Sequence, residues 1–253
     1  MLSVERKLKI AEIITRNGGI KTSDLSSMFK VSEMTILRDL SILEQKGVLK
    51  RVYGGAVKIK NSTREISLII RKNLNPVQKN IIAEKALSYI STGECIFLDG
   101  STTALALARK LAELQVEITV ITNGFEIINE LKDNPGIKTI CPGGELQNST
   151  LSFVGPDAES YLRELFADKC FISASGLSLK SGITVENPVQ ASIKKIMLKN
   201  SIQKIVIIDS TKFGTTRLSK VCEFKDIDII ITDQKPAEKY LDFFRENNIV
   251  IIF

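Results

Sequence analysis

Histidine is absent from the 253 residues of the sequence. Without an imidazole, the chain cannot hold a Ser–His–Asp triad, a His-ligated zinc or iron site, or an imidazole general base. Cysteine is scarce, and none of the four cysteines belongs to a C-x-x-C pair. Reduced thiols in a cytosolic protein are the expected state of Cys95, Cys141, Cys170 and Cys222.

Long apolar runs are also missing. The longest are about five residues, as at residues 249–253, whereas a membrane span needs roughly 20. The N-terminus lacks the apolar stretch of a signal peptide, so we expect a cytoplasmic protein without membrane contact. Hydrophobic residues at 43% and charged residues at 25% are ordinary globular values, and the length predicts one large or two ordinary domains.

The excess positive charge is confined to the first 60 residues. They hold 12 Lys and Arg against 6 Asp and Glu, whereas residues 61–253 hold 23 of each sign. The whole net charge of +6 is therefore N-terminal. This asymmetry predicts a nucleic-acid-binding segment joined to a neutral segment that has another task.

The sequence predicts three parts, which we call the head (residues 1–57), the linker (residues 58–74) and the body (residues 75–253). The head opens with apolar residues at helical spacing, starting at Val4, and Gly18 follows this first helix. Such periodicity predicts an amphipathic helix that a glycine ends. Polar and charged residues with few helix signals predict the linker.

Two short helices are predicted next in the head. Thr22 and Ser23 are expected to cap a helix over residues 24–29. Ser32 is expected to cap a longer helix that ends near Lys46, because Ser and Thr are favoured at helix N-caps. Two helices joined by a tight turn are typical of a helix-turn-helix.

The longer helix has an apolar face and a polar row opposite it. Ile36, Leu40 and Leu43 share one face at i, i+4 and i+7. Arg can bridge guanine O6 and N7, Gln can read adenine, and hydroxyls can contact a phosphate or a base edge. We therefore predict that a major groove is contacted by Met34, Thr35, Arg38, Ser41 and Gln45, with Thr22, Ser23 and Ser32 nearby.

Residues 48–56 predict a strand followed by a tight turn with cations, the wing of a winged helix. Lys50, Arg51 and Tyr53 are expected at the flanking DNA backbone. The alternative is a small helical packing module whose polar face is merely solvated. That alternative accounts neither for the basic wing nor for the charge asymmetry.

Three segments of the head resemble the DeoR family of bacterial transcriptional regulators. They are VSEMTILRDL at residues 31–40, LEQKG at residues 43–47 and RVYGGA at residues 51–56. The family patterns are V-S-x-x-T-I-R-R-D-L, L-x-x-x-G and R-x-H-G-G-A. Leu37 stands where the family usually has its first arginine, and Tyr53 replaces the usual histidine. The resemblance implies a DNA-binding regulator whose affinity or target sequence differs from the family norm.

The body begins with Asn75 and Pro76, which predict a helix to about Ile90. Short apolar segments then alternate mostly with segments of helical length, which predicts an α/β fold with a largely parallel sheet covered on both faces. The expected strands are 95–98, 118–121, 137–140, 169–172, 204–208, 227–231 and 249–253, and the expected helices are 103–114, 125–131, 157–165, 188–200 and 236–246.

Five of the expected strands end in small polar residues. Parallel sheets bind ligands outside the carboxyl ends of their strands, and free backbone N–H groups, hydroxyls and a lysine suit an anion. Each loop alone is more often a turn or a cap, but their convergence predicts a phosphate or phosphosugar site. The expected contacts are Asp99, Gly100, Ser101, Thr102, Thr103, Asn123, Gly143, Gly144, Gly176, Glu186 and Lys212. For Glu186 a helix cap is an equal alternative.

These strand ends also resemble the DeoR-family effector domain, which is similar in fold to ribose-5-phosphate isomerase and CoA transferases. The segments are residues 99–103, 121–123, 143–144, 182–184 and 209–214. The resemblance implies an inducer that is a phosphorylated sugar or related catabolite, contacted by Asp99, Thr102, Thr103, Asn123, Gly143, Gly144 and Lys212. Ser101 replaces the glycine that is usual at its loop position.

A sugar-phosphate isomerase-like enzyme with an appended DNA-binding head is the alternative function. Such isomerases carry a D-G-A-D-type motif where residues 172–177 have no carboxylate. We therefore predict a regulator, without catalytic residues, metal or cofactor, that represses a sugar or polyol catabolic operon. Its expected partners are double-stranded operator DNA, a phosphorylated sugar or polyol effector, and further copies of itself in a homo-dimer or higher homo-oligomer.

Overall fold

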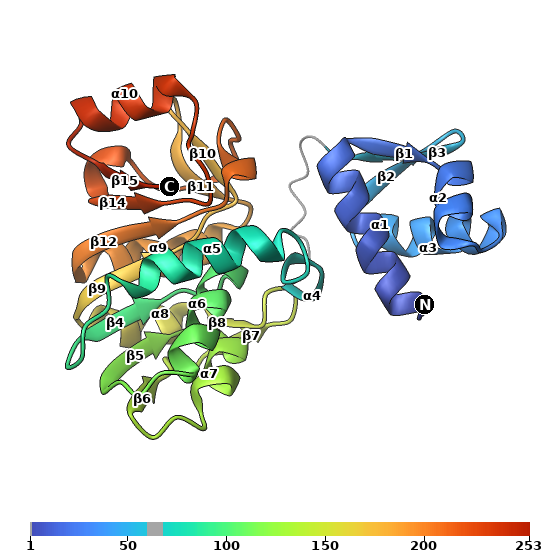
Figure 1. Ribbon diagram of the computed structural model, residues 1–253. Coiled ribbons are helices and arrows are strands. Elements are labelled where there is room, and N and C mark those ends of the chain that lie inside the picture. The colour runs from blue at the N-terminus through green and yellow to red at the C-terminus, as the bar shows by residue number, and fades with distance from the viewer. Residues whose placement is uncertain (1, 60–67) are drawn as a thin grey trace. The chain divides into compact units, whose positions relative to one another are not determined.

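The computed structural model describes residues 2–59 and 68–253 and separates into two compact units, Met1–Asn75 and Pro76–Phe253 (Figure 1). Each unit is described by itself. Within the described ranges, no helix is both long and apolar enough to cross a membrane.

The N-terminal unit is a winged helix-turn-helix. Its three short strands form an antiparallel sheet in the order β1-β3-β2, and the turn between β2 and β3 forms the wing. The elements are α1 (Ser3–Asn17), β1 (Gly19–Lys21), α2 (Thr22–Phe29), α3 (Glu33–Gln45), β2 (Leu49–Val52), β3 (Gly55–Lys58) and α4 (Leu68–Arg71). The predicted helices and wing are confirmed, whereas β1 was not anticipated.

The core of this unit is formed by side chains of α1, α2, α3 and the wing strands. The predicted apolar face of α3 is confirmed, because Ile36, Leu40 and Leu43 are buried. The predicted stripe of α1 is wrong at its first position, since Val4 is 62% exposed. Arg6 of α1 and Asp39 of α3 form a buried ion pair with 2.6 Å between Nε and Oδ2, which ties the two helices together.

The predicted linker needs a correction. Residues 60–67 lie outside the described residues, but Leu68–Arg71 form the short helix α4. Ile70 is buried in the core of the N-terminal unit, and Leu74 packs against that core. Ile70 and Leu74 therefore belong to the folded N-terminal unit.

The C-terminal unit is built on a parallel seven-stranded sheet in the order β15-β14-β12-β9-β4-β5-β6. All seven predicted strands are confirmed, with ends that differ by a few residues. They are β4 (Cys95–Leu98), β5 (Ile118–Thr122), β6 (Ile137–Ile140), β9 (Ala167–Ile172), β12 (Ser201–Ile207), β14 (Ile229–Ile231) and β15 (Val250–Ile252).

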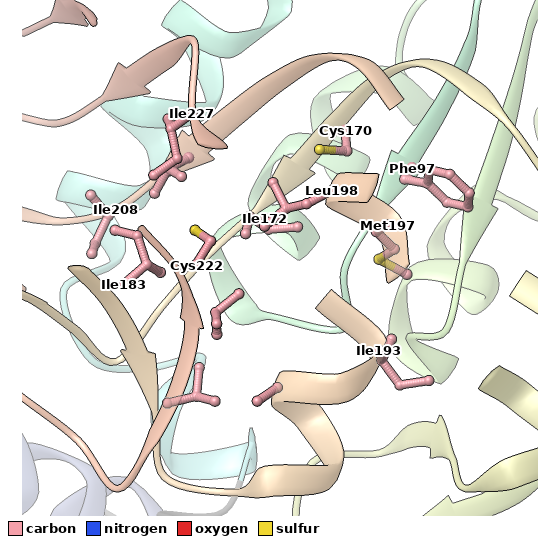
Figure 2. Packing of buried hydrophobic residues seen from close by; sticks show 14 of the residues in the cluster. Phe97, Cys170, Ile172, Ile183, Ile193, Met197, Leu198, Ile208, Cys222 and Ile227 are labelled. Carbon is pink, nitrogen blue, oxygen red and sulfur yellow. The ribbon is translucent and has the colours of Figure 1, made fainter. Parts of the chain in front are cut away.

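Helices cover both faces of this sheet, as predicted. Successive residues of a strand point to opposite faces, so Ile96 and Leu98 pack with α5, α6 and α7, whereas Phe97 packs with α8 and α9. Figure 2 shows Cys170 and Cys222 within the second of these clusters. The helices are α5 (Pro76–Leu87), α6 (Thr102–Ala112), α7 (Phe125–Leu131), α8 (Pro156–Arg163), α9 (Pro188–Lys199) and α10 (Glu238–Glu246).

Five short antiparallel strands were not predicted. β7 (Glu145–Gln147) and β8 (Ser152–Val154) form a hairpin, while β10 (Gly176–Ser178), β11 (Gly182–Val185) and β13 (Ser219–Cys222) form a small sheet. Segments of three or four residues carry too little periodicity to be recognised, and the pairing of β13 with β11 spans a long stretch of chain.

Candidate functional site

Helix α3 is the second helix of the helix-turn-helix, and we call it the recognition helix. It presents most of the predicted polar row to solvent. Ser32 is its N-cap, and its Oγ accepts the backbone N–H of Thr35 at 3.3 Å. Met34 is 68% exposed, Arg38 and Gln45 are also exposed, and Thr35 and Ser41 are half-buried. Burial of the opposite apolar face fixes this orientation.

The wing presents its cations and an aromatic ring. Lys50, Arg51 and Tyr53 are all exposed. Glu44 at the end of α3 accepts the backbone N–H of Arg51 at 2.8 Å, and its Oε2 lies 3.7 Å from Nε of Arg51. Glu44, which sequence reasoning missed, therefore joins the wing to the recognition helix. Leu37, which replaces a family arginine, is partly exposed on α3.

The prediction for Thr22 is wrong in two respects. The N-cap of α2 is Lys21, and no side chain caps this helix. Thr22 lies inside the first turn, is 4% exposed, and donates its backbone N–H to Gly54 O at 2.8 Å. Thr22 thus holds α2 against the wing turn and offers no hydroxyl to DNA, whereas Ser23 is exposed.

Five predicted effector loops follow β4, β5, β6, β9 and β12 of the parallel sheet, so they lie at its carboxyl edge, whereas Glu186 follows β11 of the small antiparallel sheet. The strand order reverses between β4 and β9, because the chain continues from β4 to β5 on one side and returns to β9 on the other. Doubly wound sheets bind ligands at such a switch point. The loops after β4 and β9 are therefore the centre of the candidate site.

Asp99, the residue after β4, stabilises the loops at this edge; we call a residue with such a structural role a builder. Its side chain is 1% exposed, and its oxygens accept the backbone N–H groups of Ser101 at 3.1 Å and Ser173 at 2.7 Å. The same carboxylate accepts a hydrogen bond from the ammonium group of Lys194 on α9. Asp99 therefore has a structural role in these loops, and its predicted contact with an effector stays a prediction.

Helix α6 begins at this switch point. Ser101 is its N-cap, with φ −86° and its Oγ accepting the N–H of Ala104 at 3.1 Å. The position therefore requires no glycine, although the family usually has one there. The backbone N–H groups of Thr102 and Thr103 have no acceptor among the described residues. These two N–H groups are oriented toward the space beyond the helix start, where an anion is favoured.

Asn123, the residue after β5, is also a builder. Its Oδ1 accepts the N–H of Gly100 at 2.9 Å, and its Nδ2 donates to Phe153 O at 3.0 Å. The side chain is buried, so Asn123 has a structural role here, and its predicted effector contact stays a prediction. Gly100 is needed for packing, because a Cβ there would overlap Ser152 Oγ. Asn123 thus holds the β7–β8 hairpin against two of the loops.

The other predicted glycines serve the backbone. Gly143 and Gly144, after β6, have φ of +67° and +95°, which L side chains rarely adopt. Gly176 lies where a Cβ would come within 2.8 Å of Thr184 Oγ1. Gly143 and Gly144 thus permit a turn, and Gly176 of β10 permits a close approach of neighbouring segments.

Two predicted charged residues have partners of opposite sign. Glu186 Oε1 lies 3.3 Å from Nε of Arg217, a residue that sequence reasoning missed. Lys212 Nζ lies 3.9 Å from Oδ2 of the buried Asp209. About a third of the Lys212 side chain is exposed, so this ammonium group is accessible to an incoming anion.

Sequence reasoning also missed the polar residues of α9 that face this edge. Gln190 and Lys194 are both buried, and they lie four residues apart on one helix face. Polar residues in the buried stripe of a predicted helix are the signal that could have found them.

A winged helix-turn-helix joined to a parallel α/β domain with polar strand ends is the architecture of a DNA-binding regulator with a sensor domain. Residues 6–62 match the DeoR-like helix-turn-helix domain, and residues 74–234 match the DeoR C terminal sensor domain. The chain belongs to the DeoR family of transcriptional regulators.

Proteins similar to this chain over most of their length are named as transcriptional regulators or repressors. The HTH-type transcriptional regulator YulB of Bacillus subtilis is 40% identical over 92% of this chain and 90% of its own. The lactose phosphotransferase system repressor of Staphylococcus epidermidis is 31% identical over 94% and 95%. Among solved structures, ribose 5-phosphate isomerase A of Methanocaldococcus jannaschii matches with a TM-score of 0.42 and 19% identity over 55% of each chain.

Proposed function

We propose that the protein represses a sugar or polyol catabolic operon and that a phosphorylated sugar or polyol releases it from its operator. Membership of the DeoR family supports this proposal, as does the name of the lactose phosphotransferase system repressor. The mechanism is linkage, in which the effector favours a state with lower operator affinity. Reciprocity requires the operator to weaken effector binding by the same factor.

The head, residues 1–57, is the proposed operator-binding domain. Arg38 and Gln45 read base edges from α3, while Lys50, Arg51 and Tyr53 of the wing contact the flanking backbone. The exposure of these five side chains supports the assignment. A homo-dimer or higher homo-oligomer places two heads on repeated half-sites, which multiplies affinity.

The body, residues 75–253, is the proposed effector domain. The observation that carries this assignment is the start of α6, where the N–H groups of Thr102 and Thr103 have no acceptor among the described residues at the switch point of the sheet. We assign them to the phosphate of the effector, together with the ammonium group of Lys212. Gly143, Gly144 and Glu186 contribute from neighbouring loops.

We propose that the body is a sensor without enzymatic activity. Sugar isomerisation requires a carboxylate free to move a proton between carbons. The loop after β9 contains no carboxylate, and the oxygens of Asp99 hold two backbone N–H groups and a lysine. Neither the loop after β9 nor Asp99 therefore supports the isomerase alternative.

The test is binding of the full-length protein to a labelled fragment of its own upstream region across a panel of phosphorylated sugars and polyols. Release by one compound supports the proposal and identifies the effector. Tight binding that every compound leaves unchanged contradicts the effector assignment while retaining the DNA-binding head. Absence of DNA binding contradicts the assignment of the head.

A further inference from the structure

Helix α9 carries two buried polar side chains that reach different parts of the carboxyl edge. Gln190 donates from Nε2 to Gln147 Oε1 at 2.8 Å and to Thr150 Oγ1 at 3.0 Å, both in the β7–β8 hairpin segment. One turn further along the helix, Lys194 donates to Asp99. The two residues are 7% and 6% exposed, so one face of α9 holds both the hairpin and the loop after β4.

The carboxylate of Asp99 connects the two loops at the switch point. It accepts the N–H of Ser101, which precedes α6, and the N–H of Ser173, which follows β9. A buried carboxylate that lacks a positive partner is strongly destabilising. Lys194 supplies that partner from α9, and the geometry of both loops thus depends on this lysine.

We propose that Lys194 is a positioning residue of the effector site. Through Asp99 it holds the loops after β4 and β9 so that the N–H groups of Thr102 and Thr103 remain directed at an incoming anion. Gln190 fixes the hairpin to the same face of α9. The inference rests on the proposed effector function, but the order that Lys194 imposes on the loops is measurable without an effector.

The first measurement is hydrogen exchange at individual backbone amides in the full chain. We expect Lys194→Met to remove protection at Ser101 and Ser173, because Asp99 is then unpaired, while amides inside β4 and β9 stay protected. Lys195→Met is the matched control, since Lys195 is the next residue on α9 and is exposed. Unchanged protection at Ser101 and Ser173 in the Lys194→Met protein would overturn the proposal.

The second measurement is titration with inorganic phosphate, followed through the amide signals of Thr102 and Thr103. We expect Lys194→Met to weaken phosphate binding about tenfold, the equivalent of one lost charge-assisted hydrogen bond. Lys195→Met should bind like the wild type. If the wild type itself shows no shift with phosphate, the proposed effector site fails, while the exchange result still decides the role of Lys194.

A double variant separates positioning from general stability. Asp99→Asn with Lys194→Met removes both charges at nearly constant volume, so we expect its melting temperature to lie above that of Lys194→Met alone. The asparagine has one acceptor oxygen for two N–H groups, so phosphate binding should stay weakened. Recovery of wild-type phosphate affinity together with stability would show that the pair merely stabilises the fold, and would overturn the proposal.

Discussion

The head and the body each contain a buried ion pair, but the pairs have different surroundings. Arg6–Asp39 joins α1 to α3 beneath a row of exposed side chains that are themselves the proposed DNA contacts. Lys194–Asp99 lies among the predicted effector residues, and one member of the pair is such a residue. In the head, the residues that stabilise the fold and the proposed DNA contacts thus lie on opposite sides of α3. In the body, the residues that stabilise the loops and the proposed effector contacts lie in the same loops.

This difference follows from the size of the ligand. DNA is contacted from outside, so its contacts must be exposed, and helical periodicity separates them from the core. A small anion is surrounded by loop ends, where the same small polar residues either build the loop or bind the ligand. Asp99 and Asn123 proved to be builders, while Lys212 is accessible.

The largest expected effect comes from breaking the ion pair of the head. Arg6→Met leaves the carboxylate of Asp39 buried without a partner, and we expect the N-terminal unit to lose about 3–5 kcal/mol of stability. Calorimetry should show its transition shifted downward while that of the body is unchanged. Arg245→Met, which removes an exposed pair with Asp242, should cost at most about 1 kcal/mol. A shift of the body transition in Arg6→Met would contradict the independence of the two pairs.

Removing the accessible cation of the body should separate sensing from DNA binding. Lys212→Ala loses a charge-assisted hydrogen bond to the phosphate, worth about 1.5–3 kcal/mol, so effector affinity should fall about tenfold to a hundredfold. Operator affinity without effector should be unchanged. Both affinities are measured by titration. The control is Lys199→Ala, which removes an exposed lysine at the C-terminal end of α9. An unaltered effector titration would show that Lys212 lies outside the site.

Removing Arg38, the cation at the centre of α3, tests the proposed DNA contacts of the head. We expect Arg38→Ala to weaken operator binding by about 1–3 kcal/mol if the guanidinium group reads a guanine, without lowering the melting temperature of the N-terminal unit. The control is Lys9→Ala, an exposed cation on α1. Equal losses in both variants would indicate a general charge effect and remove Arg38 from the reading face.

The smallest expected effect concerns the thiols, all of which lie in the body. Burial raises the pKa of Cys170 and of Cys222 from 9.0 to about 12. Both should therefore resist thiol reagents in the folded body, while the half-buried Cys95 and Cys141 are labelled sooner.

The same pKa shifts predict the sign of a pH effect. Unfolded thiols ionise near pH 9, whereas the folded ones keep their protons until about pH 12. Their contribution to the stability of the body is thus complete below pH 9 and declines between pH 9 and 12. Urea unfolding at pH 8 and pH 10 measures it, and a body that is more stable at pH 10 would contradict the assignment of the thiols as buried.

Much of the fold followed from patterns that act locally. The central strand Cys95–Leu98 was predicted to the residue, because a parallel strand buried on both faces reads as a continuous apolar run. The wing of the head was predicted, but β1, which pairs with β3 across the unit, was not. Pairing between distant short segments leaves no periodic signal in either one.

The sequence by itself determined the parallel sheet and the exposed face of α3, because periodicity depends on neighbouring residues alone. The class of the protein followed from the charge asymmetry together with the resemblance of its motifs to a known family. Tertiary structure decided which polar residues at the strand ends are builders. Whether the carboxylate of Asp99 meets a ligand or Lys194 depends on where α9 packs, and that position is set by contacts between segments far apart in the chain. It likewise buried Thr22, whose hydroxyl the sequence alone left available for DNA.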